Sequence, residues 1–226
     1  MKNRITMAGH IEPCWLFVFR GEAERLRELL PEPLNLLTEK GFAFVNVVVC
    51  HLRGMRPAAM PIRAGLSYWH IAYRLYAESP GQQGLYFMRS DADSPLIVAS
   101  GNLLTSFHFH HARVRVQGRH ICIEATGANL SATISEEEQT TLAAGSPFGT
   151  LREASEFLKY KPAALIPVGG KTHALRITRD EAAWKSRLVQ VEDARFEYLK
   201  GLDLQLELCY EVEPIDYVWN RAEVLA

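Results

Sequence analysis

The chain has 226 residues, of which 48% are hydrophobic and 23% charged, and its formal net charge is −1. This is the composition of a globular protein with a sizeable core, and the near-zero charge gives no general attraction to nucleic acid or to a membrane surface. No apolar run reaches the roughly 18 residues of a transmembrane helix, and the short apolar stretch near the N-terminus lacks a cleavage site.

The cysteines are far apart in the sequence and show none of the spacings of a metal site. They therefore predict free thiols in the reducing cytoplasm, although a disulfide stays open at this point. The four residues are Cys14, Cys50, Cys122 and Cys209.

The first part of the chain predicts mostly strands. Apolar or alternating stretches favour strands, and leucines at helical spacing favour one helix that ends at Pro31. In the stretch 66–78, His70 and Arg74 share one face and Tyr73 lies on the other. The predicted elements are a strand at 14–19, a helix at 22–31, a strand at 42–53, a loop at 54–65, and strands at 66–78 and 85–90.

The stretch 84–116 is the element around which the chain is organised. A short strand leads into a helix whose first residue is predicted to be Pro95, where the missing N–H costs nothing. Asp93 or Ser94 can cap the free amides of the first turn. Asp91 lies near the positive end of the helix dipole, and we expect it either to support the cap or to face a pocket.

A second strand, at 107–117, follows this helix and carries three histidines. Its period of two separates His108 and His110 from Phe107 and Phe109. The face of the two histidines becomes apolar farther along the strand, so we expect it to point inward and line a cavity. The alternative is that these are ordinary interior or rim histidines.

The rest of the chain adds strands and one helix. Strands are predicted at 119–126, which forms a hairpin with 107–117, and at 129–138, 171–178, 184–196 and 202–214, with a helix at 151–160. Helices are too few for a doubly wound parallel sheet. The predicted fold class is α+β, mainly β: an antiparallel closed barrel or cone with a few outer helices, in a single domain over 1–226.

Several segments together resemble the acetoacetate decarboxylase-like superfamily, and within it the uncharacterised YqjF-like proteins. They are FRGEAERLRELLPEPLNL at 19–36, FAFVNVVVCHLRGMRP at 42–57 and GLYFMRSDADSPLIVASGNLLTSFHFHHARV at 84–114, with a less specific match at 151–162. The resemblance implies a cone-like antiparallel barrel with helices outside. In the decarboxylases this cone holds a lysine that forms a Schiff base with a β-keto acid.

The chain departs from the family at the position of the catalytic lysine. The family's Gly-Phe-Pro-Lys-Lys type motif aligns with residues 106–110, Ser-Phe-His-Phe-His, and no lysine occurs between Lys40 and Lys159. Lys159, Lys161 and Lys171 remain, among charged or turn residues. We therefore expect no decarboxylation through an imine.

Two further positions follow from the resemblance. Arg20 aligns with the family's active-site arginine, which can hold a carboxylate, and His70 falls where a pocket glutamate is expected. The alternatives are a surface Arg20 that closes a helix turn and a His70 that faces solvent.

These residues predict a barrel that binds a small carboxylate-bearing molecule without catalysis. The candidate pocket residues are Arg20, His70, Asp91, His108 and His110. The alternative is an enzyme that acts on a small keto acid with His108 or His110 as general acid or base.

A metal site on His108 and His110 would need a third ligand such as His70, Asp91 or Glu124, and nothing in the spacing requires one. We expect no metal and no cofactor. We also expect no nucleic acid or membrane partner, and leave homo-oligomerisation open.

Overall fold

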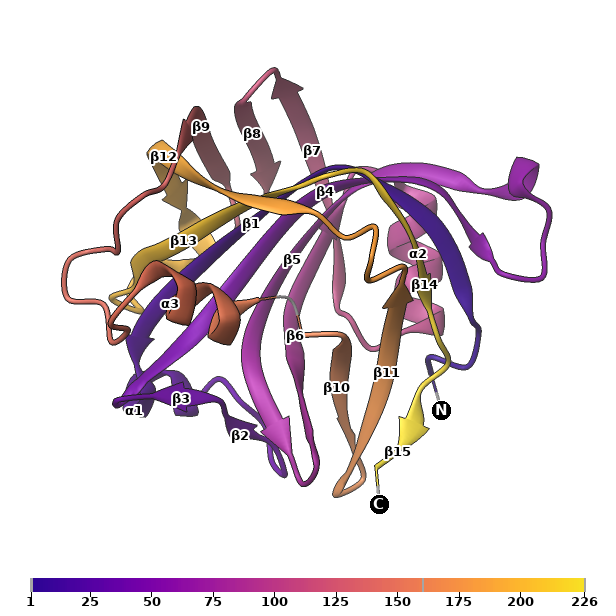
Figure 1. Ribbon diagram of the computed structural model, residues 1–226. Helices are drawn as coiled ribbons and strands as arrows, with labels where there is room; N and C mark the ends of the chain where they lie inside the picture. Colours follow the sequence, from indigo (N-terminus) through magenta and orange to yellow (C-terminus); the bar gives the residue numbers. More distant parts are fainter. Residues whose placement is uncertain (1, 160, 226) are drawn as a thin grey trace.

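A computed structural model describes residues 2–159 and 161–225, which form one continuous network of fifteen strands with three α-helices (Figure 1). The strands are β1 (Met7–Glu22), β2 (Asn35–Leu36), β3 (Thr38–Glu39), β4 (Phe42–Pro57), β5 (Leu66–Ser79), β6 (Gln82–Ala92), β7 (Phe109–Gln117), β8 (His120–Ala125), β9 (Leu130–Glu138), β10 (Ala163–Val168), β11 (Lys171–Arg179), β12 (Ser186–Phe196), β13 (Gln205–Val212), β14 (Ile215–Trp219) and β15 (Glu223–Val224). The helices are α1 (Ala23–Arg27), α2 (Pro95–Leu104) and α3 (Leu151–Leu158).

The sheet closes on itself in two rings that share one wall. The wall consists of β1, β4, β5 and β6. One ring runs from β6 through β10, β11 and β14 back to β1, and the other runs through β7, β8, β9, β12 and β13. The predicted closed, mainly antiparallel β architecture with outer helices is confirmed, although β6 pairs in parallel with both β7 and β10.

Each side of the shared wall carries a hydrophobic core, because strands that are apolar on both faces bury both of them. Leu16, Val48 and Ala72 belong to the core inside the first ring. Phe17, Val47 and Tyr73 point the opposite way, into the core under β7, β8 and β9. We call the first of these the inner face of the wall.

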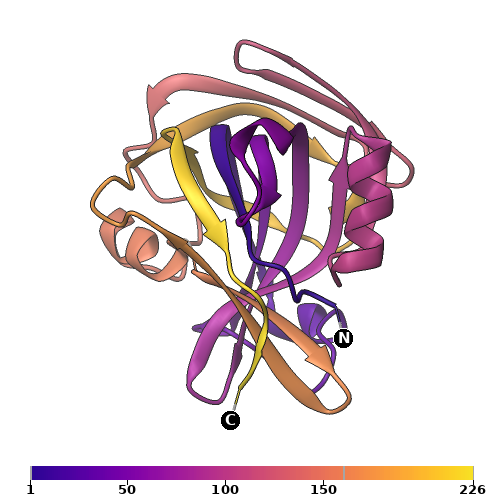
Figure 2. The same ribbon diagram turned by 90° about the vertical axis from the view of Figure 1, so that its right-hand side faces the viewer.

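The helices lie outside the strands, and Figure 2 shows α2 and α3 on opposite flanks. Pro95 is the first residue of α2, and Ser94 accepts a hydrogen bond from the Ile97 amide at 3.4 Å, which confirms Ser94 as the cap. Asp93 instead accepts the amide of Trp69 at 2.9 Å. None of the described helices is long and apolar enough to span a bilayer.

Several predicted boundaries were wrong. Helix α1 is five residues long, because the chain turns before Pro31. Strand β4 continues to Pro57, into the predicted loop, and pairing with β11 makes a strand of β10, which the sequence did not indicate. Helix α3 ends at Leu158, and Tyr160 lies outside the described residues.

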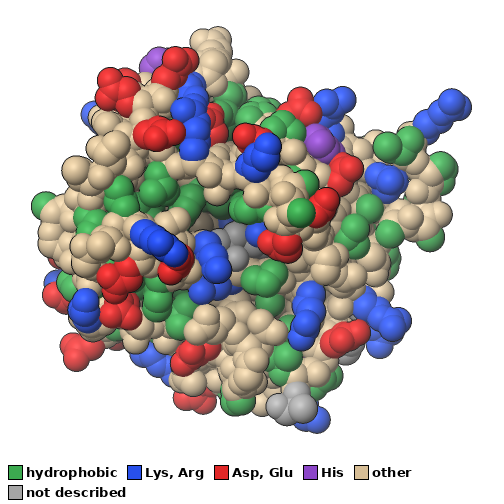
Figure 3. All heavy atoms as spheres, in the orientation of Figure 1, with side chains coloured by type: hydrophobic (Ala, Val, Ile, Leu, Met, Phe, Trp, Pro, Cys, Tyr) green, Lys and Arg blue, Asp and Glu red, His purple; other side chains and the backbone are tan. Residues whose placement is uncertain are grey.

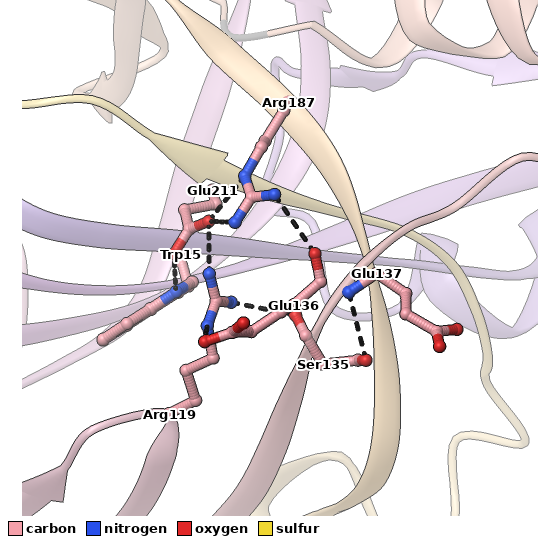
Figure 4. Close-up of polar contacts among 7 residues, drawn as sticks. All are labelled: Trp15, Arg119, Ser135, Glu136, Glu137, Arg187 and Glu211. Atoms are coloured by element: carbon pink, nitrogen blue, oxygen red, sulfur yellow. Dashed lines mark hydrogen bonds and ion pairs between the residues drawn. The ribbon is translucent and has the colours of Figure 1, made fainter.

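A half-buried carboxylate joins strands of the second ring (Figure 4). Glu211 on β13 accepts hydrogen bonds from Arg119 at 2.9 Å, Arg187 at 2.8 Å and the indole of Trp15 at 3.3 Å. Partial burial raises the pKa of Glu211, but the two guanidinium groups outweigh it and the pKa is lowered on balance. Its partners come from β1, β12 and the β7–β8 turn, so the cluster ties these elements to β13.

Charges of both signs are interspersed over the face shown in Figure 3, where no continuous stripe of one sign is seen.

Candidate functional site

A small cavity lies on the inner face of the shared wall, within the first ring. Its volume is about 50 Å³, and its walls include Cys14, Cys50, His70, Arg74, Arg179 and Trp219. A cavity of this size holds a water molecule or a group as small as a carboxylate. Lysine, aspartate and glutamate are absent from the described residues that line it.

Three of the cavity residues form a row across neighbouring strands. Cys14 on β1 lies opposite Cys50 on β4, which lies opposite His70 on β5. Residues directly opposite in an antiparallel pair share a face, so the two thiols and the imidazole all point to the inner face. The hydrogen bond with Cys14 and then burial raise the pKa of the Cys50 thiol, so Cys50 is a neutral thiol rather than a nucleophilic thiolate.

His70 is the cavity histidine. Burial, and to a smaller extent the charge of Arg74, lower its pKa to about 3, so the ring is neutral at pH 7. It stacks on Phe109 with 5.3 Å between ring centroids, and its Nε2 is buried with no hydrogen-bond partner among the described residues. Ser90, on the same face opposite Ala72, likewise leaves its Oγ without a described partner. Buried polar atoms are normally satisfied, and His70 lines the cavity whereas Ser90 does not, so the Nε2 of His70 marks a place for a polar ligand.

Two guanidinium groups bring positive charge to the cavity. Arg74 is 4% exposed, donates to Asn46 Oδ1 at 3.0 Å through Nε, and lies over the ring of Phe87 at 5.5 Å. Arg179 stacks on Trp184 at 3.3 Å, with an ion pair to Glu181 at the rim. Guanidinium is always protonated, so the cavity wall is cationic.

Arg20 lies elsewhere. It is buried near the opposite end of β1, where it pairs with the buried Glu207 and donates to Gln205 and to the carbonyl of Ala144. Arg20 is six positions from Cys14, which is roughly 20 Å along a strand. The surface alternative for Arg20 is wrong, but so is its grouping with His70 around one cavity.

Asp91 is fully buried on the other face of the wall. It forms an ion pair with Arg89 at 2.8 Å, and Arg89 lies over the ring of Tyr198. Burial raises the pKa of Asp91, and the hydrogen bond and charge of Arg89 offset part of that effect. Because Ile71, its partner on β5, neighbours His70 in sequence, Asp91 and His70 point to opposite faces.

The predicted inward orientation of His108 and His110 is wrong. Both are exposed, whereas Phe107 and Phe109 are buried in the core of the inner face. His108 adopts a left-handed backbone with φ of 53°, and Asn102 of α2 bonds both the amide and the carbonyl of Phe109. The chain thus buries two phenylalanines in preference to two histidines, which is the outcome that desolvation favours.

No group of three or more His, Cys, Asp or Glu side chains in the described part of the chain is arranged to hold a metal ion. The row of Cys14, Cys50 and His70 is no exception, since each step to the next strand adds about 4.8 Å between backbones.

The model of the family DUF2071, described as an uncharacterized conserved protein (COG2071), matches residues 14–217. The chain belongs to this family. The DUF2071 match includes the cavity row, the β1–β13 pairing that closes the second ring and all three helices. A comparison with curated proteins gives no match.

Solved structures show where the DUF2071 fold recurs. An acetoacetate decarboxylase-like enzyme from Sphingomonas wittichii RW1 matches with 13% identity, 100% of this chain, 94% of that chain and a TM-score of 0.61. Acetoacetate decarboxylase from Legionella pneumophila matches with 13% identity, 97% and 87% coverage and a TM-score of 0.64. The enduracididine biosynthesis enzyme MppR complexed with pyruvate matches with 10% identity, 100% and 91% coverage and a TM-score of 0.62. At these identities the likeness shows the fold alone, which is the predicted acetoacetate decarboxylase-like one.

Sequence reasoning missed the two thiols and Trp219. Alternation in 66–78 did place His70 and Arg74 on one face, as the structure confirms. The neighbours of His70 depend on the β1–β4 register, which joins residues 36 positions apart in the case of Cys14 and Cys50. Local periodicity carries no signal for such a pairing.

Proposed function

We propose that this DUF2071 protein binds a small carboxylate-bearing molecule in the cavity lined by His70 and Arg74, in the cytoplasm, where its buried thiols stay reduced. The observation that carries the proposal is a cationic cavity wall beside an unpartnered, neutral imidazole. A guanidinium binds a carboxylate through charge-assisted hydrogen bonds, and the imidazole can supply or accept one more.

The relatives in fold support a site for small acids. One of them is described as complexed with pyruvate, a small keto acid, and another as an acetoacetate decarboxylase. His70 stands where the family resemblance expects a pocket glutamate, and the described residues that line the cavity include Arg74 and Arg179 but no lysine, aspartate or glutamate. Such a lining suits holding a carboxylate better than removing it as carbon dioxide.

The proposal excludes imine chemistry in the cavity. An imine needs a lysine amine beside the substrate carbonyl, and the lysine-free stretch runs from 41 to 158. Lys161 is the lysine that this test must follow, because burial and, to a smaller extent, the charge of Lys159 lower the pKa of its amine. Treatment with acetoacetate and borohydride should leave the mass of the protein unchanged. A substrate-dependent adduct on Lys159, Lys161 or Lys171 would overturn this part.

The alternative function is an enzyme that uses histidine acid–base chemistry on a keto acid. His70 is the histidine placed to do so, but a pKa of about 3 makes it a weak base at neutral pH. Loss of pyruvate over hours in the presence of the wild type, abolished in His70→Gln, would support the enzyme. Stable pyruvate with saturable binding supports the binding protein.

Calorimetric titration with pyruvate and with acetate tests the proposal. We expect saturable binding by the wild type and at least about a tenfold loss in Arg74→Gln, since truncating one partner of a buried charge pair costs roughly 2 kcal/mol or more. Arg113→Gln, at an exposed arginine, is the matched control.

Because Arg74→Gln disturbs a buried network, His70→Gln and Arg74→Lys are measured beside it, and urea unfolding checks that each variant folds. The proposal fails when neither acid binds the wild type, or when binding is the same in every folded variant.

A further inference from the structure

A second, larger cavity lies beside the first, under helix α2. Its volume is about 240 Å³, and the polar groups on its wall are few. It opens to solvent past Ile5, Leu66 and Leu104, which are 42%, 39% and 43% exposed. Large apolar side chains that gather at a cavity mouth mark a binding site more often than chance exposure. The apolar walls are Met7, Met55, Ile97, Phe107, Phe109 and Leu175.

Aromatic rings connect this apolar pocket with the cavity of His70 and Arg74. Trp219 lines both spaces. Phe109 lines the apolar pocket and stacks on His70, and Tyr68 lines the pocket with its ring centroid 6.2 Å from that of His70. The centroids of His70 and Trp219 are also 6.2 Å apart. The polar cavity and the apolar pocket therefore lie next to each other, with Trp219 in the walls of both.

We propose that the two spaces are the head and tail subsites of one site, so that the ligand is a carboxylate with an apolar tail, such as a medium-chain fatty acid. This inference rests on the proposed function, because the head subsite is the carboxylate site of Arg74 and His70. The tail lies along Trp219 into the pocket under α2.

The dimensions suit this class of ligand. A volume of about 240 Å³ takes a tail of roughly eight carbons, if each occupies about the 30 Å³ of a water molecule. A keto acid as small as pyruvate leaves that apolar wall in contact with water. A tail that covers it gains affinity with each methylene it buries.

The test is a series of straight-chain acids from acetate through butanoate and hexanoate to octanoate, with octanol as the uncharged probe. Each methylene should raise the affinity of the wild type by about three- to fourfold until the pocket is full. Binding of the longer acids should change the fluorescence of the protein, because Trp219 contacts both subsites.

Ser100→Phe projects a ring from α2 into the pocket and should abolish the dependence on chain length while leaving acetate binding unchanged. Ala99→Phe, on the exposed side of the same helix, is the matched control. Arg74→Gln should weaken every acid by a similar factor and leave octanol unaffected.

The outcomes separate the two proposals. Acetate and pyruvate binding without any dependence on chain length overturns the tail subsite and leaves the proposed function standing. Chain-length dependence that survives in Ser100→Phe, or octanol that binds as tightly as octanoate, also overturns the inference. When no acid of any length binds, both proposals fall.

Discussion

Replacing His70 by glutamine should remove a large part of the acid sensitivity of the fold. Burial and then Arg74 lower the pKa of His70 from 6.5 to about 3 in the native state. His70 takes up a proton near pH 6.5 in the unfolded chain but not in the native state. Above that pH, His70 therefore does not reduce the free energy of unfolding. That free energy falls as the pH drops toward 3.

The size of the effect follows from the two pKa values. One pKa unit corresponds to about 1.4 kcal/mol, so His70 costs the native state about 2 kcal/mol between pH 7 and pH 5, and up to roughly 5 kcal/mol by pH 3. Urea unfolding of the wild type and His70→Gln at pH 7, 6 and 5 measures the difference. The contributions of the other titrating groups cancel when the unfolding free energies of the two proteins are subtracted.

His108→Asn is the control, because His108 is exposed and asparagine tolerates its left-handed backbone. It should lose stability with falling pH as the wild type does. An equal loss in His70→Gln would refute the placement of a neutral imidazole in the cavity.

Three further substitutions test the surrounding fold by the free energy of unfolding in urea. Ser94→Ala should cost roughly 1 kcal/mol through loss of the α2 cap; an unchanged value would show that the cap contributes nothing. Glu207→Gln should cost about 3 kcal/mol or more, because it leaves the Arg20 guanidinium buried without its counter-charge; a loss below 1 kcal/mol would contradict the buried pair. Gly101→Ala places a methyl group 2.5 Å from a ring carbon of Phe109 and should cost about 1–3 kcal/mol by overpacking; a neutral effect would mean that α2 sits farther from β7.

The elements that local chemistry dictates were predicted well. Pro95 after a capping serine begins α2, and Gly118 turns the β7–β8 hairpin with φ of 59°. The alternation of 66–78 gave the two faces of β5, although both faces are buried, so the solvent-facing alternative for His70 is wrong.

The candidate site was harder, because its geometry depends on contacts distant in sequence. Arg20 is held by Glu207, 187 residues away, and no local pattern predicts that pairing. Phe107 and Phe109 are buried because helix α2 covers their side of the strand, where Asn102 bonds the backbone of Phe109, whereas His108 and His110 stay exposed. The alternation along the strand could not show which of its faces a helix would cover.

The most direct measurement of the central claim is a crystal structure of the protein with an ω-brominated medium-chain carboxylate. The account predicts the carboxylate against Arg74 and His70, with the anomalous signal of bromine in the pocket under α2. A carboxylate held at Arg20, or at the outer surface beside His108 and His110, with the inner cavity unchanged, would contradict it.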